Sequence, residues 1–309
     1  MKAIQIHSYG GPEVLQVEEV ARPRVNSHDV LIKVYASGVN PIDWKAREGL
    51  TRHSLPFIPG WDVSGVVEET GAAVKNFKKG DAVYSRPDTS GNGSYAEYVV
   101  AKDDELGHKP ATIDHIAAAA IPLAGLTAWQ GLFTHGKLRQ GQRVLILGAS
   151  GGVGSFAVQF AKWKGAYVIA TTSEANLSFV RELGADEAID YRKRGYENLI
   201  MHVDLVFDTI GGDAQRNTLR LLPPGGILVT TLKIEDSAAF QRKGVRITSM
   251  MAQSNPEDLD AIARIVDEGK VQPAIQKVFP LEKAEEASRM SQEGHVRGKI
   301  VLRVREDAE

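Results

Sequence analysis

Short apolar runs separated by turn residues fill the first third of the chain. Runs such as KAIQI, VLIKVYASGV, VSGVVEETG, DAVYS and YAEYVVA alternate with breaks such as GGP, GAAVKNFKKGD and SGNGS. Runs of this length that are rich in β-branched and aromatic residues, bounded by Gly, Asn and Asp, are typical of strands joined by turns. The pattern therefore predicts a compact, mostly β unit.

From about Ile116 the pattern changes to strands that alternate with helices. Apolar residues at Val153, Phe156 and Phe160 recur at the spacing of one helix face. Six short β-branched runs are separated by such stretches: Arg143 to Leu147, Tyr167 to Thr171, Glu187 to Asp190, Asp204 to Asp208, Ile227 to Thr231 and Arg246 to Ser249. Strands interleaved with helices predict an α/β fold with a doubly wound parallel sheet.

The C-terminal part changes pattern again. After a predicted helix from Pro256 to Glu268 come the run PAIQKVFPL, an amphipathic stretch from Glu282 to Glu293 and the strand KIVLRV. We expect this last strand to pair with the first β unit, which makes that unit discontinuous in sequence. The predicted domains are residues 1–118 with 273–309, and residues 119–272.

Composition narrows the possible functions. The chain has 309 residues, 43% of them hydrophobic and 25% charged, which is typical of a soluble globular protein with more than one core. A net charge of −2 gives no overall attraction to nucleic acid or to an anionic membrane. No apolar segment approaches the roughly 20 residues of a membrane span, and the start MKAIQIHSYGG turns polar too early for a secretory signal. We therefore expect a cytoplasmic protein without nucleic-acid or membrane partners.

The chain contains no cysteine. This composition excludes disulfides, thiolate nucleophiles and every zinc site built on sulfur ligands.

The stretch VLILGASGGVG, Val144 to Gly154, places four glycines and a serine after an apolar run. In the dinucleotide-binding pattern G-x-G-x-x-G, Gly151 and Gly154 take the second and third places, and Ala149 stands in the first. The following helix N-terminus would offer free N–H groups to phosphates. The alternative is a glycine-rich strand-to-helix corner without a ligand. The residues expected to hold the diphosphate are Ser150, Gly151, Gly152, Val153 and Gly154.

The residues at the end of the second predicted strand distinguish a site for NAD from a site for NADP, which carries a 2′-phosphate. Sites for NAD place an acid about 20 residues after the glycines, and counting leads to Glu174. However, Ser173 is expected to be an N-cap, which puts Glu174 in the first helical turn, where an acid is favourable in any case. The strand end is then neutral, and the hydroxyls of Thr172 and Ser173 suit a 2′-phosphate. Tyr191, with Arg192 beside it, could complete the site, although DYRKR is nearly as well explained as a solvated loop. The sequence favours NADPH.

Eight collinear segments carry a resemblance to a known family. They are MKAI…GGPEVLQVEE, VLIKVYASGVNPIDWKAREG, LPFIPGWDVSGVV, GSYAEYVV, AAIPLAGLTAWQGL, VLILGASGGVGSFAVQFAK, ELGADEAIDY and GHVRGKIVLRV. Together they resemble the zinc-independent quinone oxidoreductase (NADPH:quinone reductase) family of the medium-chain dehydrogenase/reductase superfamily. The resemblance implies a GroES-like catalytic domain, a Rossmann domain, NADPH in the cleft between them, and a homodimer.

Departures from the zinc alcohol dehydrogenases of the same superfamily predict that no metal is bound. Those enzymes use a cysteine and a Gly-His-Glu segment for catalytic zinc. This chain has Asn40 at the place of that cysteine, and Gly60, Trp61 and Asp62 in place of Gly-His-Glu. The cysteine-rich lobe that holds their structural zinc is absent too.

The resemblance places the predicted catalytic residues in the segment N-P-I-D-W-K-A-R-E-G. It implies that Asn40 lies near the nicotinamide and substrate, although Asn-Pro is also an ordinary start of a turn. Many quinone oxidoreductases have a tyrosine where this chain has Lys45. The lysine either hydrogen-bonds the developing enolate or relays a proton, or it is a surface charge. Asp43 either orients Lys45 or caps the following turn. A lysine at this place resembles the subgroup that includes plastid-envelope quinone oxidoreductase homologues, and this resemblance implies enones and 2-alkenals as acceptors rather than quinones.

Further residues are expected at the nicotinamide end. The resemblance implies that Thr127 faces the nicotinamide, and the alternative is a helix residue that bonds its own backbone. Backbone groups after the fourth and fifth strands lie where parallel sheets place ligands. Trp44 and Trp61 either wall the acceptor pocket or belong to a core. The remaining predicted cofactor contacts are Asp208, Ile210, Thr231 and Leu232, and Lys299, which follows Gly298 and would close the cleft.

The sequence therefore predicts an NADPH-dependent, zinc-independent oxidoreductase that passes hydride to quinones or α,β-unsaturated carbonyls. The alternative is an NADPH-binding protein recruited to a non-enzymatic role, crystallin-like or RNA-binding. The lack of a basic cluster argues against RNA. A dehydrogenase of sugars or polyols is disfavoured by the missing zinc ligands.

Overall fold

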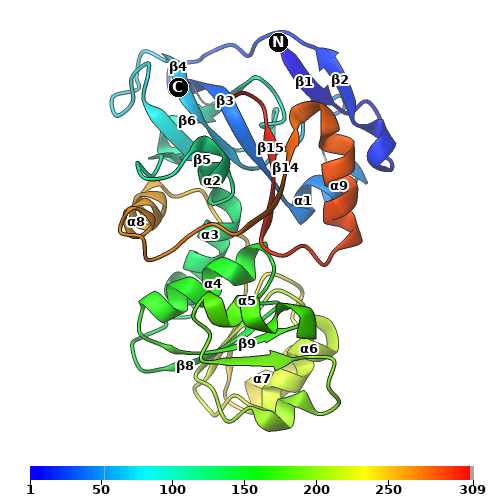
Figure 1. Ribbon diagram of the computed structural model, residues 1–309, viewed down its shortest axis with the longest axis vertical. Coiled ribbons are helices and arrows are strands. Elements are labelled where there is room, and N and C mark those ends of the chain that lie inside the picture. Colours follow the sequence, from blue (N-terminus) through cyan, green and yellow to red (C-terminus); the bar gives the residue numbers. More distant parts are fainter. Residues whose placement is uncertain (52, 307–309) are drawn as a thin grey trace. The chain divides into compact units, whose positions relative to one another are not determined.

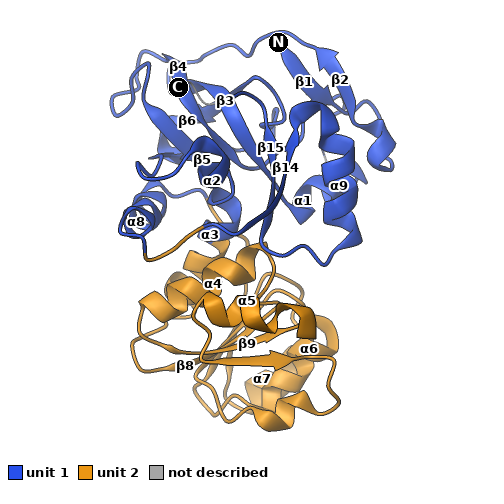
Figure 2. Cartoon of the chain, viewed as in Figure 1, with its two compact units in different colours: residues 1–126, 254–269, 273–309 blue, residues 127–253, 270–272 orange. Residues whose placement is uncertain are grey.

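The computed structural model describes residues 1–51 and 53–306, and its contacts divide the chain into two units (Figure 2). Unit 1 comprises Met1–Leu126, Ser254–Gly269 and Pro273–Glu309, and unit 2 comprises Thr127–Gln253 and Lys270–Gln272. The sequence division had assigned residues 119–126 and 254–269 to the Rossmann domain. By packing, both stretches group with unit 1.

Unit 1 is built on a seven-stranded, largely antiparallel sheet with the order β14-β15-β3-β4-β5-β7, in which β6 also pairs with β3 (Figure 1). A separate two-stranded sheet joins β1 to β2. The strands are β1 (Lys2–Gln5), β2 (Gln16–Glu19), β3 (Asp29–Val39), β4 (Val63–Thr70), β5 (Ala82–Ser85), β6 (Tyr98–Lys102), β7 (Leu106–His108), β14 (Ile275–Pro280) and β15 (Lys299–Arg303).

Helices and single turns connect these strands. They are η1 (Pro12–Val14), α1 (Pro41–Arg47), η2 (Asp103–Glu105), α2 (His115–Ala119), α3 (Pro122–Trp129, which continues into unit 2), α8 (Pro256–Asp267), η7 (Leu281–Lys283) and α9 (Ala284–Glu293). Helix α9 covers most of the amphipathic stretch predicted from Glu282 to Glu293.

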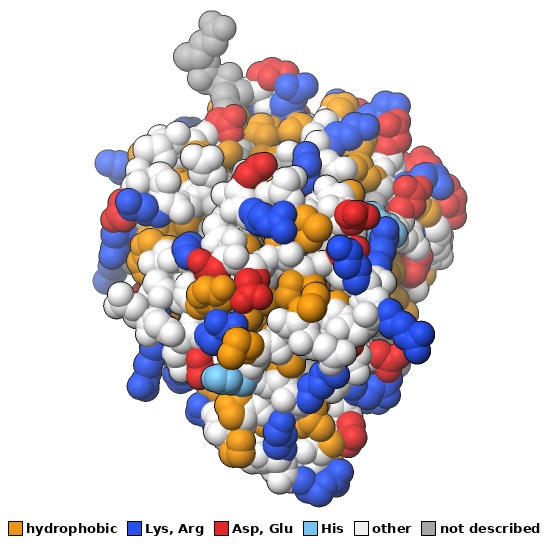
Figure 3. Space-filling view, turned by 60° about the horizontal axis from the view of Figure 1, so that its bottom comes forward, with side chains coloured by type: hydrophobic (Ala, Val, Ile, Leu, Met, Phe, Trp, Pro, Cys, Tyr) orange, Lys and Arg blue, Asp and Glu red, His pale blue; other side chains and the backbone are white. Residues whose placement is uncertain are grey.

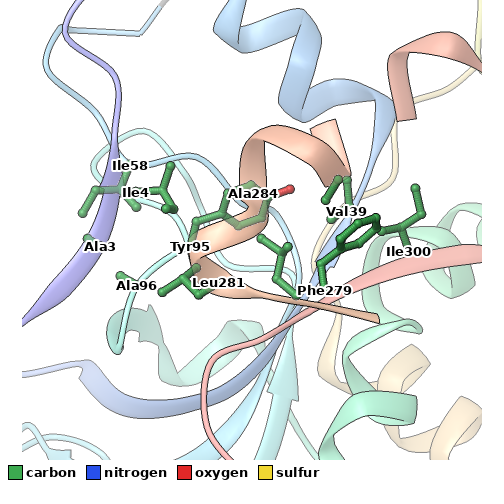
Figure 4. Close-up of a cluster of buried hydrophobic side chains, with 12 residues drawn as sticks. Ala3, Ile4, Val39, Ile58, Tyr95, Ala96, Phe279, Leu281, Ala284 and Ile300 are labelled. Carbon is green, nitrogen blue, oxygen red and sulfur yellow. The ribbon is translucent and has the colours of Figure 1, made fainter. Parts of the chain in front are cut away.

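The expectation that the C-terminal strand returns to the first β unit is confirmed. β15 pairs antiparallel with β3, with Ile300 opposite Val39 and Leu302 opposite Ser37. Ile300 and Leu302 are buried in an apolar cluster of residues from both ends of the chain (Figure 4). Because alternate residues of a strand point to one face, this register places the apolar residues of KIVLRV in the core.

Helix α8 belongs to unit 1 because of its contacts with the β5–β7 edge. The hydroxyl of Tyr84 on β5 donates to the carbonyl of Leu259 at 2.6 Å. A Cβ at Gly107 on β7 would lie 2.8 Å from Leu259 Cβ, so a glycine is needed there for the helix to pack closely. The carboxylate of Asp267 accepts from the backbone N–H and the hydroxyl of Thr112 at 2.9 and 2.8 Å. The sequence pattern gave the helix but not the sheet it packs on.

Unit 2 is a six-stranded parallel sheet with the order β10-β9-β8-β11-β12-β13. Counted along the chain this is the order 3-2-1-4-5-6 of a Rossmann fold. Its strands are β8 (Arg143–Leu147), β9 (Tyr167–Thr172), β10 (Glu187–Asp190), β11 (Leu205–Asp208), β12 (Ile227–Thr230) and β13 (Arg246–Ser249), each within one residue of the predicted bounds.

Helices cover both faces of this sheet. Figure 1 shows α4 and α5 on one side and α7 on the other. Phe240 of α7 packs in one cluster with Leu145 and Leu147 of β8. Phe156 and Phe160, on the predicted inner face of α4, are fully buried. The helical elements are η3 (Gln130–His135), α4 (Gly152–Trp163), η4 (Glu174–Asn176), α5 (Leu177–Glu182), η5 (Tyr196–Leu199), α6 (Gly212–Asn217), η6 (Thr218–Arg220) and α7 (Ser237–Arg242).

Among the described residues, no helix has the length and apolar character needed to cross a membrane.

Candidate active site

The glycine turn of unit 2 bends one residue earlier than the sequence pattern indicated. β8 ends at Leu147, and Gly148 adopts φ +76°, a conformation that favours glycine. A Cβ there would also lie 2.7 Å from Thr209 Oγ1. The tight bend is therefore made by Gly148, and the alanine at the first place of the motif, Ala149, is tolerated because it follows the bend.

Two other glycines of the turn serve different purposes. A Cβ at Gly154 would lie 2.2 Å from the carbonyl oxygen of Gly148 and 2.7 Å from Ala149 Cα, so helix α4 packs on the turn through this glycine. Gly151 has φ −77°, and a Cβ there would meet nothing closer than 3.5 Å. Nothing in the described fold requires glycine at position 151. A ligand that approaches the backbone at the start of α4 would require it, and this is the cradle expected for a diphosphate.

Hydroxyl and amide side chains lie beside this turn. Thr172, at the end of β9, donates its hydroxyl to Ser150 Oγ at 2.8 Å. The side-chain amide of Asn176 lies 3.4 Å from Ser150 Oγ and 3.3 Å from Ser173 Oγ. The backbone N–H of Tyr191 bonds to the carbonyl of Thr172 at 3.1 Å, which brings the end of β10 beside it. The structure thus gathers four of the predicted cofactor residues, and Asn176 joins them. Sequence reasoning had not singled out Asn176.

Ser173 directly precedes the turn η4, as expected of an N-cap, but its hydroxyl makes no capping hydrogen bond. Glu174 is the first residue of that turn and is exposed. The interpretation of Glu174 as a residue of the first turn is therefore supported by its position.

The loop after β11 is organised by the buried carboxylate of Asp208. Its Oδ1 accepts from the backbone N–H groups of Ile210 and Gly211 at 2.8 and 2.9 Å. Its Oδ2 accepts from Gln215 Nε2 and Thr230 Oγ1 at 2.7 and 2.8 Å. The side chain of Asp208 therefore positions the loop that was predicted to contact the nicotinamide. Any cofactor contact of this loop falls to its backbone and to the exposed Ile210.

The Thr230 hydroxyl and the backbone of Thr231 complete the edge of the sheet next to this loop. The Thr230 hydroxyl also accepts from the backbone N–H of Leu232 at 3.1 Å, and the backbone N–H of Thr231 bonds to the carbonyl of Asp208 at the same distance. Thr231 and Leu232, both predicted cofactor contacts, thus lie beside the Asp208 loop.

Unit 1 contains a buried polar cluster formed by Asn40, Asp62 and Lys299. The Lys299 ammonium donates to Asn40 Oδ1, to Asp62 Oδ2 at 3.1 Å and to the carbonyl of Val39 at 3.2 Å. The Asn40 amide donates from Nδ2 to Asp62 Oδ2 at 2.8 Å. The other oxygen of Asp62 accepts from the backbone N–H of Leu123 at 2.6 Å. These contacts join β15, the residue before α1 and the residue before β4.

This geometry corrects the role predicted for Lys299. We expected it to bind the cofactor. All three ammonium hydrogens are already used within unit 1, and the residue is only 3% exposed. Lys299 is therefore a partner of the predicted residue Asn40, and Gly298 before it, with φ +72°, allows the chain to turn into β15.

Asp43 lies beside this cluster but does not orient Lys45. Its Oδ2 accepts from the backbone N–H of Asn40 at 2.6 Å and from the hydroxyl of Tyr95 at 2.9 Å, whereas its Oδ1 has no hydrogen-bond partner among the residues that the structure describes. The alternative that it caps the turn into α1 is confirmed. The Tyr95 ring lies among the apolar residues around Ile4 and Leu281 (Figure 4).

Burial makes the Asp43 carboxyl a weaker acid than usual. Desolvation raises the pKa of Asp43 from 3.8 to about 7, although the hydrogen bonds from Asn40 and Tyr95 act in the opposite direction. The nearby Asp62 raises this pKa further, and the Lys299 ammonium lowers it. Burial also raises the pKa of Tyr95 well above its usual value.

Replacing Asp43 with asparagine is expected to change how stability depends on pH. Between about pH 4 and about pH 7 the folded protein keeps a proton on Asp43 that the unfolded chain has lost, so wild-type stability falls as pH rises through this window. Asp43→Asn removes that contribution, and its free energy of unfolding relative to wild type should rise by up to about 1.4 kcal/mol per pH unit there. Chemical denaturation at both ends of the window measures this difference.

Tyr95→Phe is the matched control, because it keeps the carboxyl and removes a hydrogen bond that lowers its pKa. In Tyr95→Phe the pKa of Asp43 should be higher, so the pH range over which stability falls should extend to higher pH. A difference between Asp43→Asn and wild type that does not change with pH would contradict the assignment.

Lys45 and the two tryptophans occupy different surroundings. Lys45 is half-buried, and its Nζ lies 5.5 Å from the centroid of the Trp44 ring. Trp61 is buried in a cluster with Ile6 and Phe57, which supports the core alternative for this residue. Thr127 is buried on α3. The proton-relay role of Lys45 and the nicotinamide contact of Thr127 stay predictions.

The unit 1 cluster does not fit a zinc ion. At the positions where the zinc enzymes carry ligands, the oxygen atoms that could coordinate a metal are Asn40 Oδ1 and Asp62 Oδ2. Both accept hydrogen bonds from the Lys299 ammonium. Trp61 offers no ligand atom. A divalent cation would have to displace a buried ammonium from these two donors, and the like charges would repel. Over residues 1–51 and 53–306, no group of three or more acidic or histidine side chains could hold a metal ion.

Sequence reasoning noted Asp62 only as a departure from zinc ligation and assigned no role to Tyr95. The signal for Asp62 was available, since an acid in the otherwise apolar run FIPGWDVSGVV requires a partner when buried. Gly38 offers a second sign, because a Cβ there would lie 2.5 Å from Asp62 Oδ2. Neither feature identifies Lys299, 237 residues away, as the partner.

An antiparallel β unit combined with a parallel sheet in the order 3-2-1-4-5-6, whose first strand is followed by a glycine turn, is the architecture of a two-domain dinucleotide-binding protein. Models of the "alcohol dehydrogenase GroES-like domain" and of "zinc-binding dehydrogenase" match residues 26–111 and 183–302. The chain thus belongs to the quinone oxidoreductase family of the medium-chain dehydrogenase/reductase superfamily.

Individual relatives cover nearly the whole chain. NAD(P)H oxidoreductase RTN4IP1, mitochondrial, from Danio rerio is 35% identical over 99% of this chain and 92% of its own length. NADPH-dependent alkenal/one oxidoreductase, chloroplastic, from Arabidopsis thaliana is 36% identical over 98% of this chain and 79% of its own. The solved quinone oxidoreductase from Coxiella burnetii is 36% identical, with a TM-score of 0.93 over 99% of both chains. The predicted family and two-part α/β architecture are confirmed.

Proposed function

We propose that the protein is an NADPH-dependent reductase of conjugated carbonyl compounds, namely quinones, enones and 2-alkenals. The observation that carries the proposal is the unit 1 cluster, where the oxygens of Asn40 and Asp62 accept from the Lys299 ammonium and one amide N–H of Asn40 has no partner in the described part of the chain. Such a site can stabilise developing negative charge by hydrogen bonding. The names of the alkenal/one and quinone oxidoreductase relatives support the same acceptor class.

The chemistry requires a hydride from the cofactor and two contributions from the chain. NADPH, when bound, would supply a hydride to the β-carbon of the acceptor, and negative charge would then develop on the acceptor's carbonyl oxygen. Donors such as the Asn40 amide would stabilise the enolate oxygen. A proton then adds to the enolate, and Lys45 is the proposed source because of its place in the segment that follows Asn40.

The surroundings of the glycine turn support NADPH over NADH. The hydroxyls of Ser150 and Thr172 are joined there by a hydrogen bond, and the end of β9 carries no carboxylate side chain. Arg192 and Tyr191 follow β10, next to Thr172. Hydroxyl donors and an arginine that follows β10 suit a 2′-phosphate. Asp190 on β10, the register partner of Thr172, accepts a hydrogen bond from the backbone N–H of Arg192.

We also propose a homodimer in the cytoplasm. β13 is an edge strand of the unit 2 sheet, and an edge strand can pair across a two-fold axis. On the face shown in Figure 3, acidic and basic side chains are interspersed, which does not favour nucleic acid as a partner. Sedimentation at several concentrations tests the dimer.

The expected result is that the purified protein oxidises NADPH when an enone, a 2-alkenal or a quinone is added. The rate should be unchanged after dialysis against a chelator and lower with NADH. Saturated ketones of the same size are the matched control acceptors, because they cannot delocalise the charge of the added hydride.

Other outcomes separate the rival functions. Saturable NADPH fluorescence without turnover of any acceptor would indicate a binding protein. Turnover of saturated alcohols that requires added zinc would overturn the proposal.

A further inference from the structure

The buried cluster of Asn40, Asp62 and Lys299 fixes one orientation of the Asn40 amide. The ammonium faces Oδ1, and the carboxylate faces Nδ2. A half-turn of the amide would place its NH₂ against the ammonium and its carbonyl oxygen against the carboxylate. Both contacts would be repulsive among side chains that are at most 4% exposed, where water cannot weaken the repulsion.

This orientation decides what Asn40 can offer to a ligand. Its carbonyl oxygen is occupied by Lys299, and one hydrogen of Nδ2 is occupied by Asp62. A primary amide has two N–H donors, so one donor is left without a partner among residues 1–51 and 53–306. Asn40 can therefore present only an N–H group and cannot present an acceptor.

We infer that Lys299, together with Asp62, is a positioning residue that holds the Asn40 amide as a hydrogen-bond donor to the carbonyl oxygen of the acceptor. This inference rests on the proposed function and assigns a role to the ion pair that replaces metal ligation in unit 1. A carbonyl oxygen only accepts hydrogen bonds, so it needs a fixed donor. A ribose hydroxyl both donates and accepts, and would bind either orientation of the amide.

The decisive variant neutralises the pair without leaving a buried charge. Lys299→Met alone leaves the carboxylate of Asp62 unpaired, which can unfold a protein. In Lys299→Met/Asp62→Asn the cluster is neutral, and the new asparagine amide can donate to Asn40 Oδ1. That contact favours the turned amide, whose N–H then points toward the former ammonium position. Lys277→Met, an exposed lysine on the neighbouring strand β14, is the control and should match wild type.

The expected result for the double variant is a fall in kcat of about a hundredfold to a thousandfold with an enone, the size seen when one oxyanion donor is lost. The NADPH dissociation constant, followed by fluorescence, should stay within about twofold of wild type. Asn40→Ala should show the same loss of kcat. The triple variant with Asn40→Ala, Lys299→Met and Asp62→Asn should lose nothing more, because the pair acts through Asn40.

The other possible results of these measurements would overturn either the inference about Lys299 or the proposed function. A double variant that folds and keeps the wild-type kcat would overturn the inference, as would losses that multiply in the triple variant. Weakened NADPH binding with unchanged kcat would assign the Asn40 donor to the cofactor instead. If the wild type reduces no conjugated carbonyl, the proposed function itself fails and the inference falls with it.

Discussion

Replacing Gly154 with alanine is expected to lower the free energy of unfolding of unit 2 by about 3 kcal/mol or more. The new Cβ would lie 2.2 Å from the carbonyl oxygen of Gly148 and 2.7 Å from Ala149 Cα, and both are backbone atoms that cannot move aside cheaply. Helix α4 would have to shift away from the turn. Since the proposed diphosphate site is the backbone at the start of α4, NADPH binding should be lost as well. Chemical denaturation and NADPH fluorescence measure the two effects.

Gly151→Ala is the matched control within the same turn. Its Cβ would make only an ordinary contact at 3.5 Å, and φ −77° suits alanine. The loss of a favourable N-cap glycine and the reduced entropy of the unfolded chain oppose one another, so stability should stay within about 0.5 kcal/mol of wild type. NADPH affinity should nevertheless fall at least about tenfold, because the methyl group occupies the approach to the backbone. A variant that keeps both stability and affinity would show that no diphosphate lies there.

Asp208→Ala should destabilise unit 2 by about 3 to 5 kcal/mol. The substitution leaves two backbone N–H groups, an amide and a hydroxyl without their acceptor at a fully buried site. Because the two N–H groups belong to Ile210 and Gly211, the loop after β11 should also lose its shape. Thermal and chemical unfolding give the change in stability, and proteolysis reports the loop.

Asp213→Ala supplies the control for this second prediction. Asp213 lies on α6, five residues along the chain, and its side chain is 87% exposed in an ion pair with Arg216. Exposed pairs of this kind contribute little, so the change should stay within about 0.5 kcal/mol. Equal destabilisation by the two substitutions would contradict the structural role given to the Asp208 carboxylate.

Much of the architecture was predictable because local patterns and burial agree. The six strands of unit 2 were predicted to within a residue because each is a short run bounded by turn residues, and the central strands β8, β11 and β12 are mostly apolar and buried on both faces, as parallel sheets require. The strand KIVLRV was predicted to rejoin the first β unit, and β15 does so next to β3. The turn chemistry was less well predicted. The pattern G-x-G-x-x-G pointed to Ala149 for the tight bend, whereas the backbone places it at Gly148.

The candidate site was only partly predictable. Asn40 and Asp43 were identified through the resemblance, and their closeness follows from three residues of separation. Lys299 was also identified, but with the wrong partner, since its ammonium binds Asn40 and Asp62 within unit 1. Tyr95 was not assigned because its hydroxyl meets Asp43 across 52 residues of chain.

By itself, the sequence determined the strand and helix pattern, the two-part α/β architecture, the glycine turn and the absence of sulfur ligands. These properties depend on residue type and on spacing over a few positions, where backbone geometry fixes what neighbours can do. The tertiary structure alone decided which ionisable groups meet in the interior of unit 1, and so turned Lys299 from a cofactor contact into the counterion of Asp62. Burial makes such pairing energetically decisive, and the partners are set by strand register between distant segments, which no local pattern encodes.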